Sequence, residues 1–348
     1  MQESPFKKLT AQIQQAFNPK PPITNLVFKG GGVRGVAYLG ALQVLDEHDL
    51  LNDLKRVGGT SAGSLTALML SMRLSVREIK DTIAAIDFPS MAQEIDNHDQ
   101  LGIVKNIVPE TANLQRFRTR FGWYANQRMH KTIEQIVAQG CRGNGRATFA
   151  DFEEMGHRRL FIVASNISRY RSEVFSYKET PHVAVADAAL MSSSIPIFFE
   201  AVRFDGTSIG QGDYYVDGGL YDNYPIHVFD RSEYADHRRY FKEGLNYETL
   251  GLFLYPLWQN RKAVNIPKRW NEFIELVISN LYHSHQVKSI TTSIVEESRT
   301  ILIDDCGIKA TDFNITAGSE KFEKLLQSGC DATREFLIKR RYIQPDSA

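Results

Sequence analysis

The sequence predicts an α/β fold built around a largely parallel sheet. Short apolar segments that suit buried strands alternate with segments whose apolar residues recur at helical spacing. Two of the apolar segments end in glycine-rich turns that lead directly into a helix, as in a right-handed βαβ unit. The carboxyl ends of such strands meet at one edge of the sheet, where α/β proteins place their ligand sites. We therefore expect the functional residues at that edge.

The same patterns predict the individual strands and helices. Apolar runs predict strands at 25–28 and 54–59, and helical spacing predicts helices at 36–50 and 62–72. Residues 75–147 are less regular and mostly helical. Later segments predict strands at 159–168, 172–177, 249–255 and within 212–226, and helices at 185–194, 267–298 and 319–341.

Composition gives little support to several function classes. The chain has 348 residues, 43% of them hydrophobic, and its 41 Lys+Arg balance 41 Asp+Glu, whereas a nucleic-acid-binding domain is expected to be basic. The cysteines Cys141, Cys306 and Cys330 form no zinc or redox pattern and indicate reduced thiols. We find neither a signal peptide nor an apolar run of the roughly 18 residues that a membrane span needs. The expected location is cytoplasmic or peripheral to a membrane, with export that needs no signal peptide left open.

A G-x-S-x-G motif occupies residues 59–63 (GTSAG), between the second predicted strand and its helix. In this motif the serine lies on a strained turn, and side chains at Gly59 or Gly63 would collide with neighbouring backbone. The turn lifts the Ser61 hydroxyl above the sheet edge, facing the N-terminus of the following helix. The motif alone is common by chance, but its strand–turn–helix context favours Ser61 as a nucleophile.

The glycine-rich loop after the first strand, KGGGVRG, fits two kinds of site. The spacing of residues 30–35 matches the G-x-G-x-x-G loop of dinucleotide-binding proteins. That interpretation expects an acidic residue at the carboxyl end of the second strand. Asp53 instead precedes this strand, which weakens the cofactor interpretation.

The same loop can serve an acyl-transfer site. Beside a serine nucleophile, the N–H groups of Gly31, Gly32 and Val33 could stabilise the oxyanion that forms when the serine attacks a carbonyl carbon. Arg34 either attracts a phosphate-bearing substrate or pairs with a carboxylate at the surface.

A serine nucleophile needs a base to take its proton. None of the nine histidines lies at a glycine-flanked strand end, but Asp217 in YYVDGG does. Gly218 and Gly219 leave room beside its carboxylate. An aspartate of ordinary pKa, about 3.9, is a poor base, so the site would have to raise that pKa. An aspartate that merely closes a β-turn remains the alternative.

These segments together resemble the patatin-like phospholipases. The resemblance lies in the loop GGGVRG, the nucleophile motif GTSAG and the DGG of residues 217–219, which continues to Asn223 and Pro225. The segment ALMSSSIPIFFEAV is similar to the helix and proline-containing turn of that family. The similarity runs from about residue 23 to 230, with weaker support to about 255.

The resemblance implies a three-layer α/β sandwich and a phospholipase A type of activity that cleaves acyl esters of glycerophospholipids through an acyl-enzyme. Ser61 and Asp217 would form the catalytic dyad, and no metal or other cofactor is implied. The oxyanion loop would comprise Gly30, Gly31, Gly32, Val33, Arg34 and Gly35, with Gly59, Gly63, Gly218 and Gly219 supporting the motifs.

The expected organisation has three parts. Residues 1–22 are expected to form a helix and linker, and 23–255 the catalytic domain, in which 75–147 is a candidate lid or membrane-facing region. Residues 256–348 are expected to form a helical C-terminal part that packs on this domain.

The expected partners are a phospholipid substrate, a membrane surface contacted peripherally and an unidentified protein activator, with no nucleic acid. The segment FRTRFGWYANQRMHK mixes aromatic and basic residues, which suits a membrane surface, although we favour packing of Phe117, Phe121, Trp123 and Tyr124 in a core or lid. An acyltransferase, a thioesterase or a catalytically silent lipid-binding module are the alternatives. The intact motifs argue against the silent module.

Overall fold

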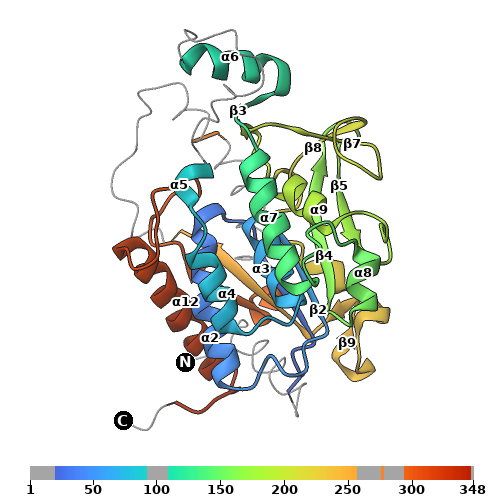
Figure 1. Ribbon diagram of the computed structural model, residues 1–348. Helices are drawn as coiled ribbons and strands as arrows, with labels where there is room; N and C mark the ends of the chain where they lie inside the picture. Colours follow the sequence, from blue (N-terminus) through green and yellow to red (C-terminus); the bar gives the residue numbers. More distant parts are fainter. Residues whose placement is uncertain (1–19, 92–108, 257–275, 278–293, 346–348) are drawn as a thin grey trace.

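A mixed sheet of eight strands forms the centre of the protein (Figure 1). The computed structural model describes residues 20–91, 109–256, 276–277 and 294–345. The strand order is β12-β11-β1-β2-β4-β8-β7, with β5 paired to β4 beside this path. The strands are β1 (Asn25–Phe28), β2 (Arg56–Thr60), β4 (Arg159–Asn166), β5 (Arg171–Ser176), β7 (Val202–Phe204), β8 (Asp213–Asp217), β11 (Thr249–Tyr255) and β12 (Thr300–Asp304).

The sheet is parallel from β12 to β4 and antiparallel beyond. Neighbouring strands in the order β12-β11-β1-β2-β4 all pair in parallel. β5 and β8 run antiparallel to β4, and β7 runs antiparallel to β8. Short turns join β4 to β5 and β7 to β8, and such connections permit only antiparallel pairing. The predicted α/β fold with a largely parallel sheet is confirmed.

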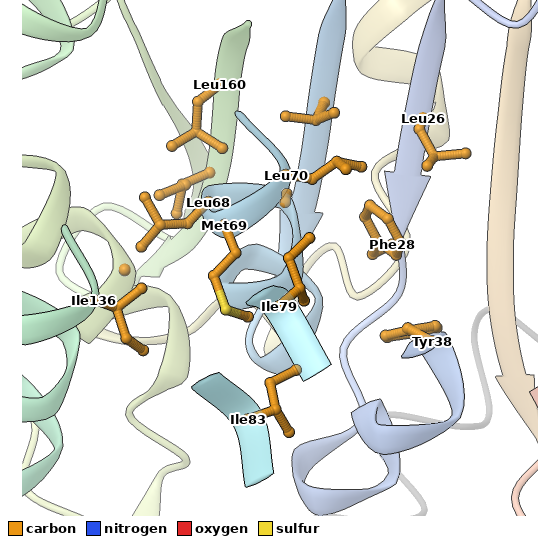
Figure 2. Packing of buried hydrophobic residues seen from close by; sticks show 14 of the residues in the cluster. Leu26, Phe28, Tyr38, Leu68, Met69, Leu70, Ile79, Ile83, Ile136 and Leu160 are labelled. Carbon is orange, nitrogen blue, oxygen red and sulfur yellow. The ribbon is translucent and has the colours of Figure 1, made fainter. Parts of the chain in front are cut away.

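Helices cover one face of the sheet. Alternate side chains of β1, Leu26 and Phe28, are buried against this layer, where Met69, Ile79 and Ile136 come from three different helices (Figure 2). The helices and 3-10 turns are η1 (Gly32–Val36), α2 (Ala37–Glu47), α3 (Ala62–Ser71), α4 (Val76–Ala84), α5 (Phe88–Met91), α6 (Pro109–Arg120), α7 (Gln127–Gly140), α8 (Phe149–Glu154), α9 (Val185–Ser193), η2 (Gly218–Leu220), η3 (Ile226–Phe229), η4 (Ser232–Tyr234), η5 (Arg238–Tyr240), α11 (Ile294–Ser298) and α12 (Glu320–Lys339).

The opposite face has its own buried cluster. Val27 of β1, Phe161 of β4 and Phe253 of β11 lie there, beneath Tyr224, Ile226, Phe229 and Tyr234 from the segment after β8. The sheet is therefore buried on both faces, which is why its parallel strands are almost continuously apolar. The short pairs β9 (Phe241–Lys242) with β10 (Leu245–Asn246) and β3 (Gly122–Tyr124) with β6 (Ile197–Phe199) lie apart from it.

Helix α12 packs closely along α2. A Cβ added at Gly40 would lie 1.9 Å from the Leu326 carbonyl oxygen, and one added at Gly329 would lie 1.9 Å from that of Ala37. Only hydrogen fits at these two positions, so the two backbones approach one another directly. This contact joins the C-terminal part to the first βαβ unit.

Most predicted elements are present with shifted ends. The strands expected at 25–28 and 249–255 match β1 and β11, and the helix expected at 319–341 is α12. The 75–147 region is mostly helical, as expected, and adds β3; its residues 92–108 lie outside the described part. The N-terminal helix and most of the 267–298 helix also fall outside the described residues.

The C-terminal part, expected to be helical, also contains a strand. Residues 300–304 form β12, which pairs in parallel with β11 and extends the main sheet. A strand of five residues is too short to be identified by periodicity when no glycine-rich turn marks it. Its pairing partner is distant in sequence, so the tertiary contact decides its conformation.

Candidate active site

Ser61 lies at a strained turn between β2 and α3. Its φ of 55° and ψ of −130° are unusual for a residue with a side chain. A Cβ at Gly59 would lie 2.5 Å from backbone of Gly63, and one at Gly63 would lie 2.4 Å from the Phe28 carbonyl oxygen. Both glycines of the motif are thus required by close backbone approach, as the sequence analysis expects.

Hydrogen bonds hold this turn in place. The Ser61 N–H donates to the Ser192 hydroxyl at 2.9 Å, and Ser192 in turn donates to the Val163 carbonyl at 2.6 Å. The Ser64 N–H and hydroxyl both donate to the Ser61 carbonyl. These bonds offset backbone strain of about 1–3 kcal/mol. Ser192, on α9, is a supporting residue that the sequence analysis does not identify.

Strand β4 brings Asp217 to Ser61. β2 pairs with β4 up to the pair of Thr60 and Val163. From the next residue of β4 onward the partner is β8, which begins with Asp217 opposite Ala164. Because β5 occupies the other edge of β4 along this stretch, β2 and β8 share one edge and meet end to end. The residue after β2 and the last residue of β8 therefore lie together.

The Asp217 carboxyl is almost completely buried, with 1% exposure. Its Oδ1 accepts the Gly219 N–H at 2.7 Å, while Oδ2 has no hydrogen-bond partner among the described residues. Burial raises the pKa of Asp217 to about 7, against the lowering effects of the Ser61 hydroxyl, the Gly219 N–H and the charge of Lys29. Ser61 thus lies close enough to influence the carboxyl, although no well-formed hydrogen bond to Oδ2 is present in this conformation.

Asn223 connects the DGG turn to the glycine loop. Its carbonyl accepts the Gly30 N–H at 2.9 Å. Its side-chain oxygen would lie 2.1 Å from a Cβ at Gly30 and 2.9 Å from one at Gly219. A Cβ at Gly30 would also lie 3.2 Å from Ser61 Cβ, so the first glycine of the loop is directly beside the serine.

The glycine loop differs in one detail from the expected set of three donors. The Val33 N–H donates to the Ala310 carbonyl at 3.0 Å, so it is engaged within the protein and the expectation for this donor is wrong in this conformation. In the described part of the chain, the N–H groups of Gly31 and Gly32 donate to no backbone carbonyl. Gly32 has φ +58°, and its Cβ would lie 2.1 Å from the Ala310 oxygen. The loop thus needs glycine here on both conformational and steric grounds.

Arg34 is buried and paired inside the protein. Its Nη1 lies 2.8 Å from Oδ2 of Asp305, and its Nε donates to the Gly31 carbonyl at 2.9 Å. Of the two roles left open for Arg34, the structure shows pairing with a carboxylate, in the interior rather than at the surface. Gly35 of the same loop lies against α3, where its Cβ would be 3.1 Å from that of Ala62.

Lys29 is the main site residue that the sequence analysis misses. It follows β1 directly and is completely buried. Its ammonium group lies 3.3 Å from the Gly30 carbonyl and 4.9 Å from the ring centroid of Phe253. Burial and the nearby charge of Arg34 lower the pKa of Lys29 to about 7. The available signal was a lysine placed directly between an apolar strand and the glycines.

The aromatic segment at 117–124 divides between packing and exposure. Tyr124 packs on Phe198 with ring centroids 4.8 Å apart, and Phe198 stacks on Phe313 at 5.4 Å. Phe121 is 50% exposed and meets Tyr214 edge-on. Tyr124 thus packs against neighbouring rings, whereas Phe121 lies at the surface.

The remaining candidates lie elsewhere. His227 pairs with Asp230 at 2.7 Å, and His283 and His285 fall outside the described residues. Asp53 is exposed between α2 and β2, away from the carboxyl end of the strand. Cys141, Cys306 and Cys330 are free thiols.

Comparison with known proteins shows which family the chain resembles. A family model described as patatin-like phospholipase matches residues 26–230. An uncharacterised protein of Acanthamoeba polyphaga mimivirus is 26% identical over 324 residues, which cover 91% of this chain and 94% of the relative. A cGAMP-activated phospholipase of Vibrio cholerae is 25% identical over 270 residues, covering 67% of this chain and 68% of the relative.

A solved structure shares the fold. The crystal structure of VipD from Legionella pneumophila aligns with a TM-score of 0.55 at 19% identity, over 92% of this chain and 68% of that chain. At this identity the similarity supports the architecture, a mostly parallel sheet flanked by helices, rather than a particular activity.

Proposed function

Since the chain belongs to the patatin-like phospholipase family, we propose that it is a phospholipase A that cleaves acyl esters of glycerophospholipids with Ser61 and Asp217. Family membership supports the broader activity of a lipid hydrolase. The observation that carries the finer proposal is the strained Ser61 beside the buried Asp217 carboxyl. We place the catalytic unit within 23–255, completed by contacts from residues 305–310.

The first step is attack on the ester. The Asp217 carboxylate accepts the hydroxyl proton of Ser61 as Oγ forms a bond to the acyl carbonyl carbon. The carbonyl electron pair moves to oxygen and creates an oxyanion. The N–H groups of Gly31 and Gly32 are the donors proposed to stabilise it, each worth about 3 kcal/mol in such sites.

The second step releases the lysophospholipid. The oxyanion collapses, the bond between the acyl carbon and the alcohol oxygen breaks, and the protonated Asp217 returns its proton to that oxygen. This leaves the acyl group on Ser61. Water then attacks the acyl-enzyme, gives a proton to Asp217 and releases the fatty acid as Ser61 is reprotonated.

The raised pKa makes an aspartate suitable for this role. General acid–base catalysis is most efficient when the pKa of the group lies near the working pH. An aspartate at about 7 accepts a proton in the attack and returns it to the leaving group at neutral pH. This supports a dyad without histidine.

The proposed substrate is reached at a membrane surface. None of the described helices is both long and apolar enough to span a bilayer. We assign peripheral contact to the exposed Phe121 at the carboxyl edge of the sheet. Ser61 is only 6% exposed, so admission of a lipid requires an opening of the site, which an interface or a protein activator would favour.

The test is labelling with a fluorophosphonate ester followed by mapping of the modified residue, together with fatty-acid release from phospholipid vesicles. Wild type is expected to be modified at Ser61 and to release fatty acid. Ser61→Ala and Asp217→Asn, as folded proteins, should lose about 10⁴-fold in rate, as when a catalytic triad member is altered. Modification of another residue, or full activity of either variant, would overturn the assignment.

Product analysis separates related chemistries. Free fatty acid as the product in the presence of an alcohol acceptor supports a hydrolase, whereas transfer to the alcohol indicates an acyltransferase. Preference for a thioester over an oxygen ester indicates a thioesterase. A wild type that stays unlabelled and inactive with anionic vesicles and candidate protein activators would contradict the enzymatic proposal.

A further inference from the structure

Lys29 occupies an unusual position for a lysine. Its side chain has 0% exposure, and lysines are almost never fully buried without a paired charge. In the described part of the chain no carboxylate lies within ion-pair distance of its ammonium group, which is held by the Gly30 carbonyl and the Phe253 ring. The burial of an ammonium group in such surroundings is costly, so a purely structural role is poorly served by lysine.

The sheet places Lys29 next to the proposed dyad. Phe28 pairs with Gly59, so Lys29 reaches the level of Thr60, one residue before Ser61. Asp217 lies opposite Ala164, one residue beyond the Val163 partner of Thr60, so it continues the line of β2 at the level of Ser61. Lys29, at the end of the neighbouring strand β1, and Asp217, in line with the end of β2, therefore both lie beside the turn that carries Ser61.

The charged groups around Lys29 come from three elements. Arg34 of η1 repels its charge, whereas Asp305 after β12 and Asp217 at the end of β8 attract it. Arg34 and Asp305 form an ion pair with each other at 2.8 Å. Their opposite charges therefore largely cancel for groups that lie farther away. The Ser61 hydroxyl, the Gly219 N–H and the charge of Lys29 all lower the pKa of the Asp217 carboxyl. Lys29 is therefore the cation that acts on the carboxyl.

We infer that Lys29 is a positioning residue whose buried ammonium group keeps the Asp217 carboxyl ionised and able to accept the Ser61 proton. This inference rests on the proposed function for its catalytic meaning, but the electrostatic coupling of the two groups can be measured independently of activity. Burial raises the pKa of the Asp217 carboxyl, which makes it a stronger base. The charge of Lys29 opposes this rise and so keeps the carboxyl from being permanently protonated. Because the interaction lies within a buried site, salt screens it weakly.

The test replaces the cation by neutral side chains of similar length, Lys29→Met and Lys29→Gln. The first readout is the pH dependence of kcat/KM with a soluble p-nitrophenyl ester. In both variants the acid limb is expected to move upward by about one pH unit, which is a roughly tenfold loss on that limb. A packing defect would lower kcat/KM at all pH values without moving the midpoint.

Tyr38→Phe is the matched control. The Tyr38 hydroxyl donates to the Lys29 carbonyl, so this variant disturbs the backbone of Lys29 without removing its charge. Its acid limb is expected to keep the wild-type midpoint. A shift in Tyr38→Phe equal to that in Lys29→Met would contradict an effect of charge.

A second readout does not need activity. Isotope-edited NMR follows the signals of the side-chain carboxyl carbons across the neutral pH range. The Asp217 signal is the one that is absent from the spectrum of Asp217→Asn. The Asp217 midpoint should rise in both lysine variants and stay in Tyr38→Phe. If wild type hydrolyses no ester while this midpoint moves, the proposed function fails and the coupling holds. An unmoved midpoint in folded lysine variants overturns the role of Lys29.

Discussion

Arg34 and Asp305 form a buried ion pair, Nη1 to Oδ2 at 2.8 Å, across 271 positions of sequence. Arg34 belongs to the glycine loop inside the family-matched region, whereas Asp305 lies 75 residues beyond its end at 230 (305 − 230). The Val33 bond to the Ala310 carbonyl reinforces this link. The C-terminal part is therefore a structural support of the loop beside Ser61.

Breaking this pair on one side should destabilise the protein strongly. Asp305→Asn leaves the Arg34 guanidinium buried without its counter-charge, which typically costs about 3–5 kcal/mol. Urea unfolding measures the change. The double variant Arg34→Met/Asp305→Leu removes both charges and should lose less stability. Equal losses in the single and double variants would show that packing, rather than the charge, dominates.

Glycine at position 61 should relieve backbone strain. The φ of 55° favours glycine, so Ser61→Gly is expected to be about 1 kcal/mol more stable than Ser61→Ala, while both lack the proposed nucleophile. Thermal unfolding of the two variants, which differ by one methyl group, measures this difference. A more stable alanine variant would mean that the turn carries no strain.

The pH dependence of stability should reveal the raised pKa of Asp217. Burial raises its pKa from 3.8 to about 7, so between these values the folded protein binds more protons than the unfolded chain. Its stabilising contribution is therefore present below about pH 4 and is lost as pH rises towards 7. Asparagine does not titrate, so Asp217→Asn should gain stability relative to wild type over this window, by up to about 4 kcal/mol.

Urea unfolding at several pH values in that window provides the measurement. A difference between the two proteins that does not change with pH would contradict a raised pKa for Asp217. Lys29, with a lowered pKa, affects the range above pH 7, where stability is regained as pH rises. Measurements below pH 7 therefore isolate the carboxyl.

Phe121 should matter at a lipid surface and not in solution. Its side chain is half exposed at the carboxyl edge of the sheet, beside Tyr214. Phe121→Ala is expected to reduce vesicle binding about tenfold or more, because burial of an aromatic side chain contributes about 1.5–3 kcal/mol. Tyr177→Ala is the control, since Tyr177 is 43% exposed but follows β5 at the opposite end of β4. Co-sedimentation with anionic vesicles distinguishes them, and equal loss in both would contradict a localised contact.

Elements that depend on interactions between neighbouring residues can be predicted from the sequence. β1 and β11 are apolar runs bounded by turn signals, and the elbow at Ser61 needs glycines within two residues on either side. Asp217 followed by two glycines is an equally local signal. Such patterns are readable because steric exclusion and strand burial act on neighbouring residues.

Which of these groups meet, and what surrounds them, depends on the assembly of the whole fold. The pairing of β12, the burial of Lys29, the Asp305 partner of Arg34 and the capture of the Val33 N–H by Ala310 depend on distant segments of the chain. No local periodicity encodes such contacts, because a charge or a carbonyl acquires its partner only when the sheet and its connections are assembled. The raised pKa of Asp217 arises in the same way, since it comes from burial and not from the residues beside it in sequence.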